Sequence, residues 1–481
     1  TTSRIVVQFS GLINRGTIVG TGDYIGGTIG YFSDRDGDQT LYITKANNTG
    51  SVSGKVNVGG ILGYASGSFK SYINDSNSIA SITGEAYVGC IAGTANRITL
   101  NNCSNKGSTL NATKYITSNG NKYAYVGGFV GCGYSANNCT NEVDINYTAG
   151  GSYVGGVIGH VRSGQANNMN DLENKGNIFG SSCVGGIIGY YYTDTTSRIV
   201  VQFSGLINSG TIVGTGDYIG GTIGYFSDRD GDQSLYISDA QNLGAVKGKT
   251  NVGGITGYAS ASVGSYIIDS KCAAVIEGEA IIGCVAGTAS GIAVNNCTNI
   301  GSALRASKYV IENNNKCAYV GGFVGKGYTA NDCANEVVIN YMAGGSYVGG
   351  IIGYINFGRE KTMSNLENNV NVNGANYVGG IIGYYYANTT SRITVQFDNM
   401  KNNGNVKGNG DYIGGIVGFF SDRDGDQTLY MSEAHNYGNV EGSSYVGGIV
   451  GYAKASTSSY IMDSTTAYGK IAGKLERITI K

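Results

Sequence analysis

The segment at residues 377–384 reads Y-V-G-G-I-I-G-Y, and close variants of it recur along the whole chain. The 14 copies begin at Tyr24, Asn57, Tyr87, Tyr125, Tyr153, Cys183, Tyr218, Asn251, Ile281, Tyr319, Tyr347, Tyr377, Tyr412 and Tyr445. The third and seventh positions are glycine in every copy. Self-similarity at a fixed period of this length is the sequence signature of a stacked repeat architecture.

The spacing of the copies has a longer period of its own. Successive copies start 33, 30, 38, 28, 30 and 35 residues apart, and the same six distances then repeat. Residues 1–39 match residues 195–233 with one difference, Arg15 against Ser209, and residues 389–427 are a more diverged third copy. We therefore expect a single continuous solenoid over 1–481, with internal units 1–194, 195–388 and a partial 389–481. Residues 467–481 are interpreted as a degenerate C-terminal motif and cap.

Each repeat reads as a coil of short strands. In the second coil, residues 39–44, 51–54 and 57–64 are predicted strands, and a turn is predicted at residues 47–50. The chain has 81 Gly and no Pro, which suits stacked β-structure because proline removes a ladder donor. A coil this small cannot bury its apolar face alone, so neighbouring coils must stack. The predicted fold is all-β, a parallel β-solenoid (β-helix) of about 14 coils of roughly 30 residues, with three short strands per coil.

An Asn-x-Gly turn supports the stacking. It recurs at Asn14, Asn48, Asn105, Asn174, Asn208, Asn242, Asn299 and Asn436. Asparagine tolerates left-handed dihedral angles, and its side-chain amide can bond the same asparagine one coil away. The sequence therefore predicts an asparagine ladder.

The V-G-G-I-[IV]-G core, preceded by N-x-G-x-[IV]-x-G, resembles the GLUG-motif repeats of secreted and surface-anchored adhesin-like proteins. The resemblance covers essentially the whole chain. It implies a β-solenoid in an extracellular or cell-surface protein, and it implies no ligand. The 28- and 38-residue coils depart from the family's pattern, as do Cys90 and Cys284 inside the motif.

An acidic turn, D-x-D-x-D-Q, is the sharpest candidate site and occurs three times. Carboxylates at its first, third and fifth positions can converge on one Ca²⁺ ion, and the twelfth position supplies a closing acid in two copies. The residues are Asp34, Asp36 and Asp38, then Asp228, Asp230, Asp232 and Asp239, then Asp422, Asp424, Asp426 and Glu433. The alternative is a solvated acidic turn that binds no ion.

The cysteines suggest a second kind of site. Asn-Asn-Cys-Ser-Asn at 101–105 recurs in related form at 137–141, 295–299 and 331–335. Adjacent stacked residues fall within disulfide range, which predicts Cys103–Cys139 and Cys297–Cys333 as links between coils. The alternative is a ladder of buried thiols.

Aromatic residues recur at the two ends of the motif. Position one is Tyr in 10 of 14 copies and position eight is aromatic in 9. Tyr24, Tyr31, Tyr218, Tyr225, Tyr412 and Phe419 would form strips able to stack on sugar rings or on a partner protein. The alternative is that the rings only stabilise the ladder.

Composition argues against several functions. The 32 Lys and Arg balance 33 Asp and Glu, so the charge footprint of a nucleic-acid binder is missing. No apolar run approaches a membrane span. Only His160 and His435 are present, which gives no Ser-His-Asp or Cys-His arrangement. We therefore expect no enzyme. A β-helix lyase or hydrolase using the acidic turn is the less favoured alternative.

The sequence as a whole indicates a non-catalytic extracellular or cell-surface repeat protein, serving as a structural scaffold, fibre subunit or adhesin stalk. Self-association end to end, as a homo-oligomer or filament, is expected because an open solenoid end presents unpaired backbone groups. The second interpretation is a carbohydrate- or surface-binding module that grips cell-surface glycans with its Tyr strips. No cofactor is expected other than Ca²⁺.

Overall fold

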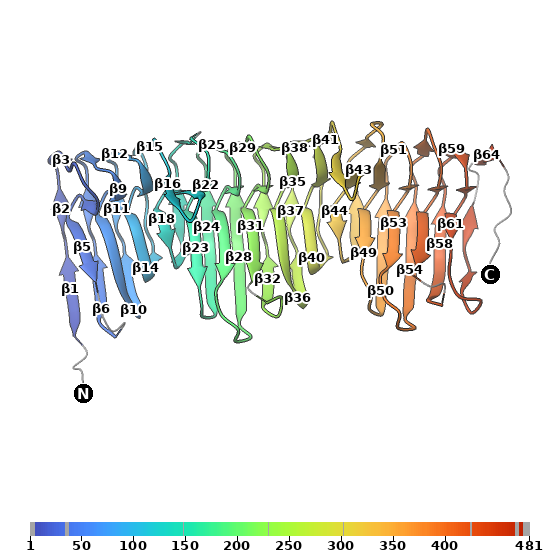
Figure 1. Ribbon diagram of the computed structural model, residues 1–481, viewed down its shortest axis with the longest axis horizontal. Coiled ribbons are helices and arrows are strands. Elements are labelled where there is room, and N and C mark those ends of the chain that lie inside the picture. The colour runs from blue at the N-terminus through green and yellow to red at the C-terminus, as the bar shows by residue number, and fades with distance from the viewer. Residues whose placement is uncertain are drawn as a thin grey trace. The chain divides into compact units, whose positions relative to one another are not determined.

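The structure is a computed structural model, which describes residues 5–33, 38–147, 149–228, 230–301, 303–423, 426–466 and 471–474. Within these ranges every regular element is a strand, and none is a helix that could cross a membrane. The strands form a parallel β-solenoid of about 14 turns, which confirms the predicted fold class. Figure 1 shows strands of successive turns side by side.

The chain divides into two compact units, Thr1–Lys247 and Gly248–Lys481. This boundary differs from that of the sequence duplication, because residues 194 and 195 both lie inside the first unit. Each unit has three faces, which we call the motif face, the long face and the third face. The motif face contains the start of each Y-V-G-G-I-I-G-Y segment, and the long face follows it along the chain.

In the first unit, the motif face comprises β4 (Ile25–Gly26), β9 (Val56–Gly59), β13 (Ala86–Gly89), β17 (Asn121–Gly127), β22 (Ser152–Gly155), β26 (Val184–Gly185) and β30 (Ile219–Gly220). The long face comprises β1 (Val6–Ser10), β2 (Ile13–Asn14), β5 (Ile29–Ser33), β6 (Thr40–Thr44), β7 (Asn47–Asn48), β10 (Leu62–Asn74), β11 (Asn77–Ser78), β14 (Ala92–Asn101), β18 (Val130–Gly133), β19 (Ser135–Asn137), β20 (Cys139–Asn141), β23 (Ile158–Ser163), β24 (Asn167–Asn174), β27 (Ile188–Thr193), β28 (Val200–Asn208), β31 (Ile223–Asp228), β32 (Ser234–Ser238) and β33 (Gln241–Asn242). The third face comprises β3 (Ile18–Val19), β8 (Val52–Ser53), β12 (Ser81–Gly84), β15 (Thr109–Ala112), β21 (Ile145–Asn146), β25 (Ile178–Gly180), β29 (Ile212–Gly214) and β34 (Val246–Lys247).

In the second unit, the motif face comprises β35 (Thr250–Gly253), β39 (Ala280–Gly283), β43 (Asn315–Gly321), β48 (Ser346–Gly349), β52 (Val378–Gly379), β56 (Ile413–Gly414) and β60 (Val446–Gly447). The long face comprises β36 (Thr256–Ile268), β37 (Lys271–Cys272), β40 (Ala286–Asn295), β44 (Val324–Gly327), β45 (Thr329–Asn331), β46 (Cys333–Asn335), β49 (Ile352–Asn356), β50 (Lys361–Asn368), β53 (Ile382–Ala387), β54 (Thr394–Asn402), β57 (Val417–Asp422), β58 (Thr428–Asn436), β61 (Val450–Ala453), β62 (Tyr460–Met462) and β63 (Thr465–Thr466). The third face comprises β38 (Val275–Gly278), β41 (Ala303–Ala306), β47 (Ile339–Asn340), β51 (Val372–Gly374), β55 (Val406–Gly408), β59 (Val440–Ser444) and β64 (Ile471–Lys474).

The 38-residue coil contains an insertion that its length alone did not explain. Strand β16 (Ile116–Ser118) pairs antiparallel with the start of β17, and β42 (Val310–Glu312) pairs in the same way with β43. Each hairpin adds length outside the stack and lets the chain rejoin it in register.

The motif itself is a corner, so the prediction of one strand over residues 57–64 was wrong. Strand β26 ends at Gly185 and β27 begins only at Ile188. A Cβ atom built on Gly186 would lie 2.2 Å from the carbonyl oxygen of Gly221 and 2.5 Å from Oδ1 of Asn208. Glycine is therefore required because the neighbouring turn and an asparagine side chain occupy the space of a side chain.

The predicted asparagine ladder is confirmed. The Asn174 amide donates to Asn208 Oδ1 at 2.7 Å, and the Asn208 amide donates to Asn242 Oδ1 at 2.7 Å. Each amide also donates to the carbonyl two residues along its own chain. The ladder, which Ser78 and Cys272 interrupt, has more members than predicted, because it also includes Asn141, Asn335, Asn368 and Asn402. These side chains are fully buried, so their hydrogen bonds replace those that water would make.

We predict that Asn208→Ala destabilises the first unit by about 1–3 kcal/mol, because the buried side chains of Asn174 and Asn242 each lose the hydrogen bond that they make with Asn208. The exposed Asn168→Ala is the matched control and should change stability by less than about 0.5 kcal/mol. Denaturant unfolding followed by circular dichroism measures both. Equal midpoints for the two variants would contradict a stabilising ladder.

Candidate functional site

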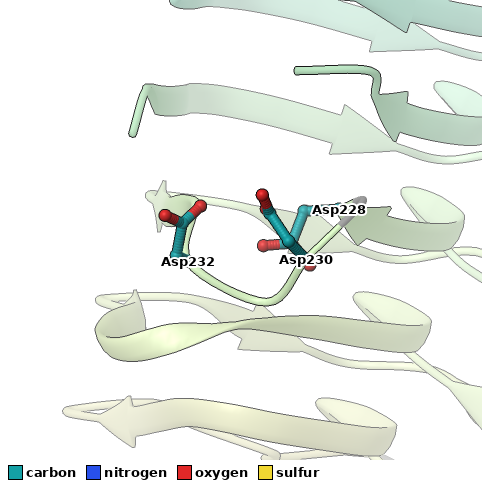
Figure 2. Close-up of side chains that lie close together, drawn as sticks. All are labelled: Asp228, Asp230 and Asp232. Carbon is teal, nitrogen blue, oxygen red and sulfur yellow. The ribbon is translucent and has the colours of Figure 1, made fainter. Parts of the chain in front are cut away.

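The acidic turn of the first unit brings three carboxylates together. Ligand oxygens of Asp228, Asp230 and Asp232 all lie within 4.8 Å of one another. Figure 2 shows the three side chains gathered on the loop that leaves β31. Burial raises the pKa of Asp228 above its ordinary value, and the nearby Asp230 raises it further, against backbone hydrogen bonds that lower it. This arrangement can bridge a hard divalent cation.

The same turn is also organised from within by Gln233. Its backbone N–H donates to Asp228 Oδ2 at 2.9 Å, and its fully buried side-chain amide donates to Asp232 Oδ1 at 2.8 Å. Arg198 lies 3.5 Å from a carboxylate oxygen of Asp232. In the other copies Gln39 and Gln427 make the corresponding bonds to the fifth-position aspartate, at 3.0 and 2.9 Å. Glutamine at the sixth position, which an EF-hand would reserve for glycine, thus has a structural role here.

The other predicted ligands fall into three groups. Asp34, Asp36 and Asp424 lie outside the described residues, whereas Asp38, Asp422 and Asp426 flank the equivalent turns. The predicted closing acids Asp239 and Glu433 are wrong as ligands. Strand β32 separates Asp239 from the turn by five residues, about 16 Å of extended chain, and Glu433 lies within β58, behind the first five residues of that strand.

We predict that millimolar Ca²⁺ raises the unfolding midpoint of the chain, because a cation bound only by the folded turn stabilises it by about 2.7 kcal/mol at a hundredfold excess over its Kd. The double variant D230N/D232N should lose this shift in the first unit's turn. The exposed Asp171→Asn serves as control and should keep it. An unchanged midpoint in the wild-type chain would leave Gln233 as the sole organiser of the turn.

The predicted cysteine pairs are adjacent but not bonded. Ser104 pairs with Thr140, and Thr298 with Ala334, so Cys103 stacks on Cys139 and Cys297 on Cys333. All four are buried free thiols in the structure, which thus contains a ladder of thiols at the positions of the predicted disulfides. In parallel strands in register the Cβ atoms stay about as far apart as the strands, ~4.8 Å, whereas a disulfide needs about 3.8 Å. Burial raises the pKa of Cys333 to about 12.

The six predicted strip residues do come together. Tyr24 meets Tyr31 edge to face at 5.1 Å, and the pairs Tyr218–Tyr225 and Tyr412–Phe419 repeat this at 4.9 Å. Along each column the rings stack face to face on those of the next turn, for example Tyr377 on Tyr412 at 4.9 Å and Tyr384 on Phe419 at 4.7 Å. Because neighbours cover both faces of most rings, the columns stabilise the stack and offer few open faces to a ligand.

One column is interrupted, and a groove opens there. In the first unit, motif position eight runs in register from Tyr31 to Tyr64, Thr94, Cys132, His160, Tyr190 and Tyr225. Thr94 and Cys132 are too small to fill the space between the rings of Tyr64 and His160. The resulting groove has a volume of about 910 Å³. Sequence reasoning missed it, although the two small residues at an otherwise aromatic position could have indicated it.

Charged and aromatic side chains border this groove on the long face. Strand β10 bulges outward between Ser66 and Ser71 and exposes Phe69. The Arg97 guanidinium lies 5.1 Å from the centre of the Phe69 ring, and Tyr134 meets the same ring edge to face at 5.1 Å. Arg162 also borders the groove and pairs with Asp194. Two arginines and one aspartate give the groove a net charge of +1.

His160 contributes a neutral ring to the groove. Burial, together with the nearby Arg162, lowers the pKa of His160 to about 3. Its ring contacts those of Tyr125, Tyr153 and Tyr190 at 4.5–5.5 Å. The imidazole therefore acts as a member of the aromatic column at neutral pH.

The second unit has the same backbone course without this groove chemistry. Position eight there runs Tyr258, Thr288, Lys326, Tyr354. The Lys326 side chain occupies the place of Cys132, lies over the rings of Tyr319 and Tyr354, and pairs with Glu312 at 3.6 Å. The positions of Phe69, Arg97 and Arg162 are taken by Val263, Gly291 and Asn356. Stacking of the repeat therefore does not require the groove residues.

Comparisons with known proteins add no identification. No family model matches the chain, and no curated protein and no solved structure is found to be similar to it. The protein is thus defined as a parallel β-solenoid by its fold, and its resemblance to GLUG repeats stays a prediction from the motif.

We predict that His160→Tyr, which introduces the tyrosine found at the equivalent position 354 of the second unit, makes the free energy of unfolding depend less steeply on pH in acid. The folded chain holds His160 neutral with a lowered pKa, whereas unfolded histidine titrates near pH 6.5. The free energy of unfolding that neutral His160 contributes is complete above pH 6.5. It is lost as the pH falls toward 3, at about 1.4 kcal/mol per pH unit. Unfolding free energies measured from pH 7 to 4 should fall more steeply for wild type than for the variant. Parallel curves would show that His160 is not held neutral.

Proposed function

We propose that this chain is a non-catalytic structural repeat protein of the cell surface or extracellular space, a scaffold or stalk whose copies associate end to end. The proposal is supported first by how the chain uses its buried polar groups. The asparagine ladder, the stacked rings and the thiol column each bond or contact their own kind one turn away. These side chains therefore hold neighbouring turns together.

The observation that carries the proposal is a comparison of two nearly identical turns. In the seventh turn, seven apolar residues are fully buried: Val201, Phe203, Leu206, Ile212, Ile219, Ile223 and Phe226. Their counterparts in the first turn are partly exposed: Val7, Phe9, Leu12, Ile18, Ile25, Ile29 and Phe32. The sequences of the two turns are the same at all seven positions, so the difference comes from the sixth turn, which covers the seventh.

A turn of this sequence therefore buries its apolar residues only when another turn stacks on it. Val19 and Ile13 on the first turn are 71% and 58% exposed. An apolar turn surface bordered by strand edges can bury itself against a turn of another copy, which supports the proposed association. The extracellular location is supported by the motif resemblance alone.

We predict that sedimentation velocity over about a hundredfold range of concentration shows a growing population of end-to-end oligomers. The variant I13K/V19K should suppress them by placing charges on the stacking surface. The control I207K/V213K carries the same changes within the stack and should associate like wild type. A chain that stays monomeric throughout, or equal effects of both variants, would contradict the proposal.

A further inference from the structure

We propose that the groove between Tyr64 and His160 binds an oligosaccharide that carries carboxylate groups. This inference does not depend on the scaffold function, because the groove lies within the first unit and is independent of association. It is also distinct from the stacked aromatic columns, whose ring faces are mostly covered.

The dimensions of the groove suit a short glycan chain. Tyr64 and His160 are three turns apart in the register of position eight, a separation of about 14 Å at ~4.8 Å per turn. The volume of about 910 Å³ lies in the range of ligand-binding clefts. Thr94 and Cys132 form the floor between the two rings, so a ligand lying along the stack would replace the two missing rings.

The groove contains aromatic faces against which a sugar ring can pack. Tyr64 stacks on Tyr31 through one face at 5.1 Å, and its other face points along the column toward Thr94, where no ring follows. Phe69 is 43% exposed at the border of the groove. The C–H face of a sugar packs against an exposed aromatic ring, and its hydroxyls suit the nearby amides of Asn57 and Asn96.

The charge of the groove selects an acidic ligand. Arg97 is exposed and held over Phe69, and among the described residues no carboxylate forms an ion pair with it. Asp194 balances Arg162, which leaves one positive charge to be neutralised. A planar guanidinium binds a carboxylate through two parallel hydrogen bonds, so a uronate or sialate group fits Arg97.

A peptide is a poorer fit than a glycan. Strands β10, β14, β18 and β23 beneath the groove each pair with the turns on both sides, so they offer no free edge for an added peptide strand.

The second unit supports a ligand role for the groove residues. The duplicated backbone stacks there with Val263, Gly291 and Asn356 in place of Phe69, Arg97 and Arg162, so these three side chains of the first unit are not needed for folding.

Isothermal titration of the full chain with tetragalacturonate, a hyaluronan tetrasaccharide and sialyllactose tests the proposal, with cellotetraose as the neutral probe. We expect at least one acidic probe to bind about tenfold or more tightly than cellotetraose, the effect of a charge-assisted bidentate contact. R97G, which introduces the residue of the second unit, should weaken that binding about tenfold. R15S also removes one arginine in favour of the other copy's residue, and should leave binding unchanged.

A second variant tests the groove itself. C132K/S118E places the Lys326–Glu312 pair of the second unit into the first, where it should fill the groove and abolish binding while the fold is retained. Circular dichroism confirms folding of each variant. Binding of no acidic probe, equal binding of cellotetraose, tighter binding of a polyglutamate peptide, or insensitivity to both R97G and C132K/S118E would overturn the proposal.

Discussion

The close contact between the asparagine column and the glycine corner is the constraint on which the rest of the structure depends. Asn208 lies so near Gly186 that a Cβ atom there would be 2.5 Å from its Oδ1. Because the corner has no side chain, the buried amide can reach both neighbouring turns and satisfy the carbonyl beside it. Equivalent residues then fall into register, and every other column follows from that alignment.

Stacking in register has a chemical consequence for ionisable groups. A column of like residues shields its own members from water, so burial favours neutral forms: it raises the pKa of Cys90 to about 12 and lowers that of His160 to about 3. Reactive chemistry is thereby suppressed inside the stack. Where a column is broken, as at Thr94 and Cys132, ring faces and cationic groups border one groove.

The internal duplication allows equivalent turns of the same chain to be compared with each other. The first and seventh turns share their core residues, and their different burial isolates the effect of a covering turn. The two copies of the third to sixth turns share a backbone course, although one position is Cys132 in the first copy and Lys326 in the second. The backbone pairing therefore does not depend on which of these side chains is present. The groove residues therefore belong to one copy and are not required by the repeat.

The sequence alone determined the solenoid, its turn spacing and the asparagine ladder, because a period of near-identical segments allows only like-on-like stacking. It also placed the acidic turn and the aromatic pairs correctly. The tertiary structure decided the features that depend on the exact spacing of side chains or on several turns together. Parallel side chains keep Cys103 and Cys139 unbonded, an intervening strand removes Asp239 from the acidic turn, and the glycine corner splits the motif. The groove arises from four successive turns, so no single repeat reveals it.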